Sequence, residues 1–241
     1  MKVNILGLKI DDVTMGEAVG KVLSFTKERG CSMVFTPNAE MAMAAVKNSS
    51  LMNVLNGSDM TVPDGAGVVL GAKLLKTPVR EKVAGVDLIK SVLSSGETLS
   101  VFLYGSAPGI AEKAAEEIEK TYPSVTVCGT EHGYHDLSFS KTLIQKINSQ
   151  QPDILLVALG VPAQELWISE NKKNLVTGVA IGCGGTLDVL SGNVKRAPGW
   201  MIKINLEWFY RLIKQPKRLT RMMRIPLFLL LCIKRRLFNK S

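Results

Sequence analysis

Residues 100–122 read SVFLYGSAPGIAEKAAEEIEKTY, and this stretch decides the fold class. Its first five residues form an apolar run typical of a buried strand, and residues 105–109 form a glycine-rich turn. After the turn, apolar side chains recur at helical spacing at Ile110, Ala111, Ala114 and Ile118. A strand that turns directly into an amphipathic helix predicts a βα unit of an α/β domain.

The same alternation continues along the chain. Further strands are expected at 3–10, 31–35, 60–62, 125–128, 154–159 and 176–181, and helices at 40–47, 141–148 and 164–171. Alternating strands and helices predict a mainly parallel sheet with helices on both of its faces. We expect residues 1–194 to form this α/β domain, and residues 195–241 to form a basic, helical C-terminal appendage.

Ligands of such sheets bind beyond the carboxyl ends of the strands. This rule selects the loops 36–40, 63–67, 105–109, 160–165 and 182–188. Thr36, Asn38 and Asp64 are polar residues in these loops, and two interpretations stay open for them. They can cap helices and turns, or Asp64 can accept a proton from a bound hydroxyl group. Gly105 and Gly184 belong to glycine-rich loops whose backbone N–H groups can approach an anion.

Residues 195–241 carry most of the excess positive charge. They hold 13 of the 30 Lys and Arg residues but one of the 21 Asp and Glu residues, which leaves 17 basic and 20 acidic residues in 1–194. An apolar run at 227–233 is followed directly by three cations at 234–236. This run is too short to cross a bilayer, which needs about 20 apolar residues, and a nucleic-acid arm does not require it. We expect the appendage to lie on an anionic membrane surface, with burial in the core or in a homo-oligomer as the alternative.

Several classes of site and compartment are disfavoured. The N-terminus has no long apolar run of a signal peptide, so we expect a cytoplasmic protein that meets the membrane from inside. The four cysteines form no CxxC pair, which disfavours a zinc site or a disulfide framework. No Asp-x-Asp pair, which commonly holds a divalent ion against a nucleotide-sugar diphosphate, is present. His132 and His135 are interpreted as plain loop residues, without carboxylates at ligand spacing. A dinucleotide fingerprint followed by an acidic residue is also absent, which disfavours a nicotinamide-dependent oxidoreductase.

Taken together, a series of ordered blocks resembles the WecG/TagA/CpsF glycosyltransferase family over nearly the whole chain. The blocks are Thr36-Pro37-Asn38 with Glu40, Pro63-Asp64-Gly65 with Gly67, Gly85 with Asp87-Leu88, Leu159 to Glu165 with Trp167, Gly182-Cys183-Gly184 with Asp188, Ser191-Gly192, Arg196-Ala197-Pro198, Leu206 to Leu212, and Pro216 with Arg218 and Arg221. The resemblance implies a Rossmann-like domain with a C-terminal appendage that completes the site at the membrane.

The resemblance also implies a reaction. Family members move a sugar, typically N-acetylmannosamine or its uronic acid, from a UDP-activated donor to undecaprenyl-diphosphate-linked N-acetylglucosamine. The product serves wall teichoic acid or related surface polymers. The transfer inverts the anomeric configuration and is described as needing no metal, so no cofactor is expected.

Carried over residue by residue, the resemblance makes Asp64 the catalytic base, with Thr36, Asn38 and Gln164 lining the pocket. It makes Arg211, Arg218 and Arg221 the residues that reach over the bound diphosphate. Lys82 stands where the family usually has Arg, with Arg80 two residues earlier. Lysine is a point charge without the bidentate fork of arginine.

Two alternatives to this function stay open. The same fold can use another UDP-hexose, such as UDP-N-acetylmannosaminuronic acid or UDP-glucose. The chain can also be a non-catalytic, peripheral membrane protein that binds a nucleotide, which would keep the basic appendage and the glycine-rich loops but would not depend on Asp64.

Overall fold

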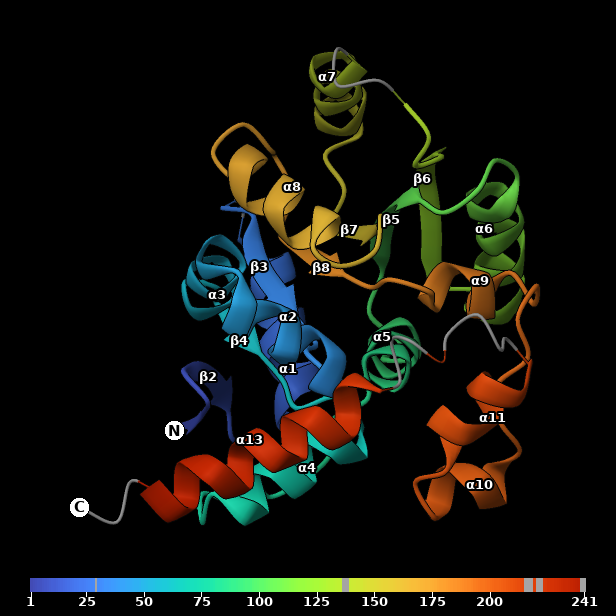
Figure 1. Cartoon of the computed structure of the whole chain (residues 1–241). Coiled ribbons are helices and arrows are strands. Elements are labelled where there is room, and N and C mark those ends of the chain that lie inside the picture. The colour runs from blue at the N-terminus through green and yellow to red at the C-terminus, as the bar shows by residue number, and fades with distance from the viewer. Residues whose placement is uncertain (29, 136–138, 215–218, 220–222, 239–241) are drawn as a thin grey trace.

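The computed structural model describes residues 1–28, 30–135, 139–214, 219 and 223–238 (Figure 1). Its centre is a six-stranded sheet with the strand order β4-β3-β8-β7-β5-β6, in which every neighbouring pair is parallel. The strands are β3 (Ser32–Phe35), β4 (Met60–Thr61), β5 (Leu99–Gly105), β6 (Val125–Glu131), β7 (Ile154–Ala158) and β8 (Val179–Gly182). The predicted α/β class with a parallel sheet is confirmed.

Helices cover both faces of this sheet, as expected. One face carries α1 (Met15–Thr26), α5 (Gly85–Leu93), α6 (Ile110–Thr121) and α9 (Thr186–Leu190). The other face carries α2 (Ala39–Lys47), α3 (Ser49–Asn56), α4 (Gly65–Leu74), α7 (Ser140–Gln150), α8 (Ala163–Asn171) and α13 (Arg224–Phe238). Successive strand residues point to opposite faces, so Val101 and Phe102 of β5 enter different cores.

The prediction of one strand over residues 3–10 is wrong. The segment forms an antiparallel hairpin of β1 (Lys2–Ile5) and β2 (Leu8–Asp11), separate from the main sheet. Its two-residue turn has positive φ angles at Leu6 (54°) and Gly7 (94°). Such turns usually contain Asn, Asp or Gly at both positions. Because Leu6 is apolar, the sequence did not indicate a turn there.

The C-terminal segment forms α10 (Gly199–Lys203), α11 (Glu207–Lys214) and α13. Helix α13 packs along α4 and also contacts α2 (Figure 1). Phe228 is fully buried there, and a Cβ atom at Gly71 would lie 2.5 Å from its ring, so only glycine allows this approach. Leu230, on the outer side of the same helix, is 61% exposed. The apolar run at 227–233 is therefore divided between the core and the surface.

Among the described residues, no helix combines the length and the apolar character needed to cross a membrane.

We expect Phe228→Ala to lower the free energy of unfolding by about 3–5 kcal/mol, because it removes a buried aromatic ring and leaves a cavity against Gly71. Leu230→Ala is the matched control on the same helix, and its exposed side chain should contribute less than about 1 kcal/mol. Urea denaturation of both variants measures the difference. Equal losses would contradict the division of α13 into a core face and a surface face.

Candidate functional site

The candidate site lies at the carboxyl ends of the parallel strands. The Asp64 turn follows β4, Thr36 and Asn38 follow β3, and Gly184 follows β8. Gln164 lies in the first turn of α8, which follows β7, and Ser106 follows β5. Because all six strands are parallel, these loops meet at one edge of the sheet. The structure thus brings together the loops that the sequence selected.

Asp64 and Asn38 form one corner of this edge. The backbone N–H of Asp64 donates to the carbonyl of Pro37 over 3.2 Å, and a Cβ at Gly65 would lie 3.8 Å from Cβ of Asn38. Asn38 caps α2, since its Oδ1 accepts from the N–H of Met41 over 3.0 Å. Asp64 occupies the N-cap position of α4, yet its carboxylate makes no capping hydrogen bond to that helix. The helix-capping interpretation is confirmed for the Asn38 side chain, whereas the Asp64 side chain does not cap α4.

Thr36 is buried beneath the first turn of α5. A Cβ atom at Gly85 would lie 2.6 Å from Oγ1 of Thr36, so the helix approaches the threonine closely only because residue 85 is glycine. Lys82, just before this helix, donates from Nζ to Oδ1 of Asn205 over 2.8 Å. It therefore links the α/β domain to the segment between α10 and α11. Arg80 lies elsewhere and pairs with Glu17 of α1 over 2.6 Å.

Gln164 joins two of the strand-end loops from a buried position. Its side chain is 2% exposed, and its Oε1 accepts from the N–H of Gly160 over 3.2 Å and from that of Gly184 over 3.0 Å. Its Nε2 donates to Oε1 of Glu165 over 2.6 Å. The amide thus braces the loops after β7 and β8 against each other. Its predicted contact with a substrate stays a prediction.

Glu165 is a residue whose role the sequence did not reveal. It is fully buried, and no described group forms a hydrogen bond with its Oε2. Burial raises the pKa of this carboxyl to about 7, although the hydrogen bond from Gln164 lowers it. The only sequence signal was its position at the end of the block Leu159 to Glu165, within the predicted loop 160–165.

The glycine-rich loops have structural reasons of their own. Gly105 has φ 123°, and a Cβ there would lie 2.5 Å from the backbone of Ala158. The next residue, Ser106, also has a positive φ of 58°, and its Oγ donates to Oδ2 of Asp188 over 3.3 Å. Gly184 has φ 51°. The predicted anion contacts of Gly105 and Gly184 stay predictions.

Arg196 ties the C-terminal segment to α5. Its guanidinium forms ion pairs with both carboxylate oxygens of Asp87 and, over 3.2 Å, with Oε2 of Glu207 at the start of α11. Burial lowers the pKa of Arg196, but the hydrogen bonds that its guanidinium donates to these two carboxylates outweigh burial and raise the pKa overall. The three residues come from three separate blocks of the sequence resemblance. Their shared function in the structure is to fix α11 beside α5.

The predicted arginines of the appendage are largely outside the described part of the chain. Arg218 and Arg221 are not among the described residues, and only the backbone of Arg211, within α11, is described. The structure instead places Arg224, which was not predicted, in a cavity of ≈ 380 Å³. The cavity is lined by Glu40, Met43, Ala44, Lys47, Val161, Pro162 and Arg224. The sequence signal that could have identified Arg224 was its position three residues after Arg221.

His132 and His135 require a correction. The two rings stack with centroids 3.9 Å apart, and Nε2 of His135 lies 2.8 Å from Oε1 of Glu131. One ligand atom from each of these three residues lies within 4.8 Å of the others, so a carboxylate does accompany the histidines. The second oxygen of Glu131 forms an ion pair with Lys146 over 2.8 Å. This ion pair gives the carboxylate a structural partner.

Glu165 predicts a pH dependence of stability. Its pKa rises from 4.5 in the unfolded chain to about 7 on folding, so the folded state binds the proton between these values. The free energy of unfolding should therefore fall as the pH rises from about 4.5 to 7, by about 3 kcal/mol from this group. Glu165→Gln should remove this part of the slope in urea titrations at several pH values.

Glu170→Gln, an exposed change on the same helix, is the control and should keep the slope of the parent. An unchanged slope in Glu165→Gln would contradict the raised pKa.

Comparisons with known proteins agree with this geometry. Residues 3–241 match the family described as "Glycosyl transferase WecG/TagA/CpsF family". A Bacillus subtilis (strain 168) protein named N-acetylglucosaminyldiphosphoundecaprenol N-acetyl-beta-D-mannosaminyltransferase is 39% identical over 206 residues, which cover 84% of this chain and 79% of that protein. A Staphylococcus aureus (strain MW2) protein of the same name is 32% identical over 232 residues, covering 95% of this chain and 91% of its own length. The chain therefore belongs to the WecG/TagA/CpsF family of glycosyl transferases.

Proposed function

We propose that this chain transfers N-acetylmannosamine from UDP-N-acetylmannosamine to N-acetylglucosamine linked to undecaprenyl diphosphate. The observation that carries the proposal is the corner formed by Asp64 and Asn38 at the carboxyl edge of the sheet, in a chain of this family. The names of the two relatives supply the sugar and the acceptor. The product would be a linkage unit for wall teichoic acid or a related surface polymer.

In this mechanism Asp64 acts as the general base. Its carboxylate takes the proton from a hydroxyl group of the acceptor N-acetylglucosamine, and the resulting oxygen nucleophile attacks the anomeric carbon of the donor. The bond from that carbon to the diphosphate breaks as the new glycosidic bond forms on the opposite face, so the configuration inverts and UDP leaves with the bonding electron pair. The donor carbon passes through an oxocarbenium-like state.

The charge of the departing diphosphate needs partners, and the proposal assigns them to the protein. The backbone N–H groups of the loops that contain Gly105 and Gly184 are candidates, as is the ammonium group of Lys82. Arg211, Arg218 and Arg221 are the further cations that the family resemblance indicates. With these groups the reaction proceeds without a metal ion, which an assay in EDTA tests.

We further propose that the protein associates with the inner face of the cell membrane, where the lipid-linked acceptor is held. The support is the outer face of α13, on which Leu230 is 61% and Leu237 is 63% exposed, with Arg235 and Arg236 between them in the last turn of the helix. An apolar face bordered by cations suits the interface of an anionic leaflet. Helix α13 begins at Arg224, in the cavity beside the candidate site.

The first test of the proposed function is Asp64→Asn. UDP release is measured from UDP-N-acetylmannosamine with a prenyl-diphosphate-linked N-acetylglucosamine acceptor, in the presence of EDTA. Removal of the base should lower kcat by about 10²–10⁴-fold, because general-base catalysis contributes on this scale. Glu117→Gln, an exposed carboxylate-to-amide change on α6, should retain the activity of the parent.

The outcomes separate the alternatives. Equal activity in parent and Asp64→Asn would contradict the assignment of the base. If the parent releases UDP only from UDP-N-acetylmannosaminuronic acid or UDP-glucose, the donor assignment is wrong and the reaction class stands. Binding of UDP without any acceptor-dependent turnover would favour the non-catalytic nucleotide-binding protein.

A further inference from the structure

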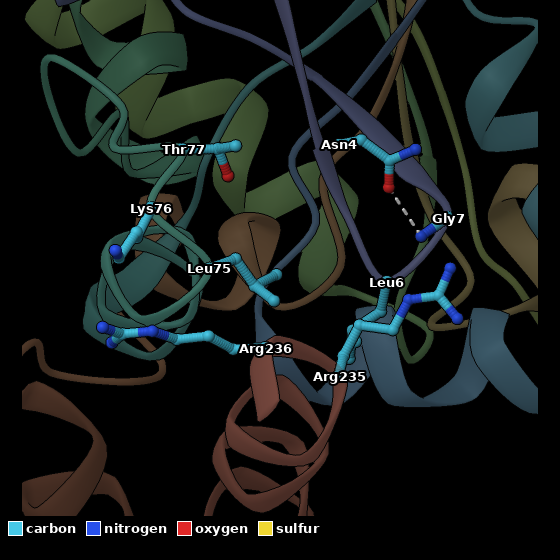
Figure 2. A pocket seen from close by; sticks show the side chains of 8 residues that line it. All are labelled: Asn4, Leu6, Gly7, Leu75, Lys76, Thr77, Arg235 and Arg236. Carbon is cyan, nitrogen blue, oxygen red and sulfur yellow. Dashed lines mark hydrogen bonds between the residues drawn. The ribbon is translucent and has the colours of Figure 1, made fainter. Parts of the chain in front are cut away.

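A second cavity lies between the β1–β2 turn, the end of α4 and the end of α13, and none of the predicted site residues that the structure describes lines it (Figure 2). Its volume is ≈ 460 Å³. The cavity is lined by Asn4, Leu6, Gly7, Leu75, Lys76, Thr77, Arg235 and Arg236. In Figure 2, Arg236 extends to the side on which Lys76 lies, and Arg235 extends toward the turn at Gly7.

The charge of this cavity is one-sided. Lys76, Arg235 and Arg236 contribute three cations, and none of the described residues that line the cavity is acidic. Throughout the described part of the chain, none of these three side chains forms a salt bridge. Cations of one sign that line one concavity create a positive potential, which favours an anionic ligand.

The neutral donors of the cavity suit the same ligand. Oγ1 of Thr77 is buried and has no hydrogen-bond partner among the described residues. Asn4 uses its Oδ1 to accept from the N–H of Gly7 over 2.8 Å, so its amide group is fixed at the rim with Nδ2 as a donor. A buried hydroxyl without a partner is costly, and an oxygen-rich anion would give it an acceptor.

The helix dipole explains only part of this arrangement. Lys76 follows α4, and Arg235 and Arg236 lie in the last turn of α13, where cations are favoured by the partial negative charge of a helix end. The dipole effect does not require that cations from the ends of two helices line one cavity. It also does not explain why the Thr77 hydroxyl has no hydrogen-bond partner among the described residues.

The surroundings identify the source of the anion. Leu230 and Leu237 are seven residues apart on α13, which places both on one outward face, and both are more than half exposed. Helix α13 is about 22 Å long at 1.5 Å per residue, and it runs from the cavity at Arg224 to the cationic cavity. A membrane along this helix would meet its apolar face and the cationic cavity together.

We propose that this cavity binds the phosphate group of an anionic membrane lipid head group. The phosphate oxygens accept from Lys76, Arg236 and Thr77, while the outward leucines of α13 enter the acyl boundary. The proposal rests on the membrane association proposed above and adds a defined head-group site to it. This site would fix the orientation of the protein on the leaflet, and with it the direction from which the acceptor lipid reaches the candidate site.

The test compares two double variants that each lose two positive charges. Lys76→Gln with Arg236→Gln removes two cations of the cavity, and Lys73→Gln with Lys234→Gln removes two exposed cations of α4 and α13 that lie outside the cavity. Flotation with phosphatidylcholine vesicles, with and without phosphatidylglycerol, measures binding. A cation in direct contact with an anionic leaflet contributes about fivefold. We therefore expect about 25-fold weaker binding for the cavity pair, whose cations hold the phosphate, and less than about fivefold for the control pair, whose cations lie outside the head-group site. Equal losses would overturn the proposal.

Thr77→Val provides an independent readout that keeps the shape of the side chain. It should weaken binding to the phosphatidylglycerol vesicles without lowering the melting temperature, because it removes a hydroxyl that lacks a partner in the protein. Unchanged vesicle binding would contradict the site. Soluble glycerol phosphate should not displace the protein from vesicles at an equal concentration of phosphate, and displacement would assign the cavity to a soluble ligand instead.

Neither donor nor acceptor sugar is present in these experiments. Failure of the head-group site therefore leaves the proposed transferase intact, and failure of the UDP-release assay leaves the vesicle result intact.

Discussion

Parallel pairing of the six strands is the constraint on which the candidate site depends. After each strand the chain must cross back to the start of the sheet before the next parallel strand can pair. Every loop that follows a strand therefore lies at the carboxyl edge of the sheet. This edge gathers Thr36, Asp64 and Gln164 from three segments that are more than 25 residues apart in the chain. The polar groups can therefore meet without any direct sequence signal that they are neighbours.

Buried polar contacts then fix the loops at this edge. The Gln164 amide holds Gly160 and Gly184 through two hydrogen bonds, and its own orientation is set by Glu165. A buried carboxyl is stable only in its neutral form or with compensating donors, which is consistent with the raised pKa of Glu165. The loops after β7 and β8 are thus coupled through a group that titrates near neutral pH.

The sequence predicted the parallel sheet, the helices on both faces and the loops of the site, because apolar periodicity and strand-end rules act locally. It did not predict the β1–β2 hairpin, since Leu6 adopts a positive φ that apolar residues rarely adopt. It also did not reveal that Glu165 is buried, or that Gly71 admits Phe228. Burial of one acid and contact between residues far apart in the chain depend on tertiary packing, which no local pattern encodes.

Helix α13 has to satisfy two different environments, and this explains the composition that marked the C-terminal segment. Its inner face needs Phe228 and Cys232 to complete the core against α4, and its outer face carries Leu230 and Leu237 in contact with solvent. A helix face that is exposed only to water usually carries polar side chains. Apolar side chains on both faces, with cations concentrated at one end, are the pattern that the proposed membrane association requires of this helix.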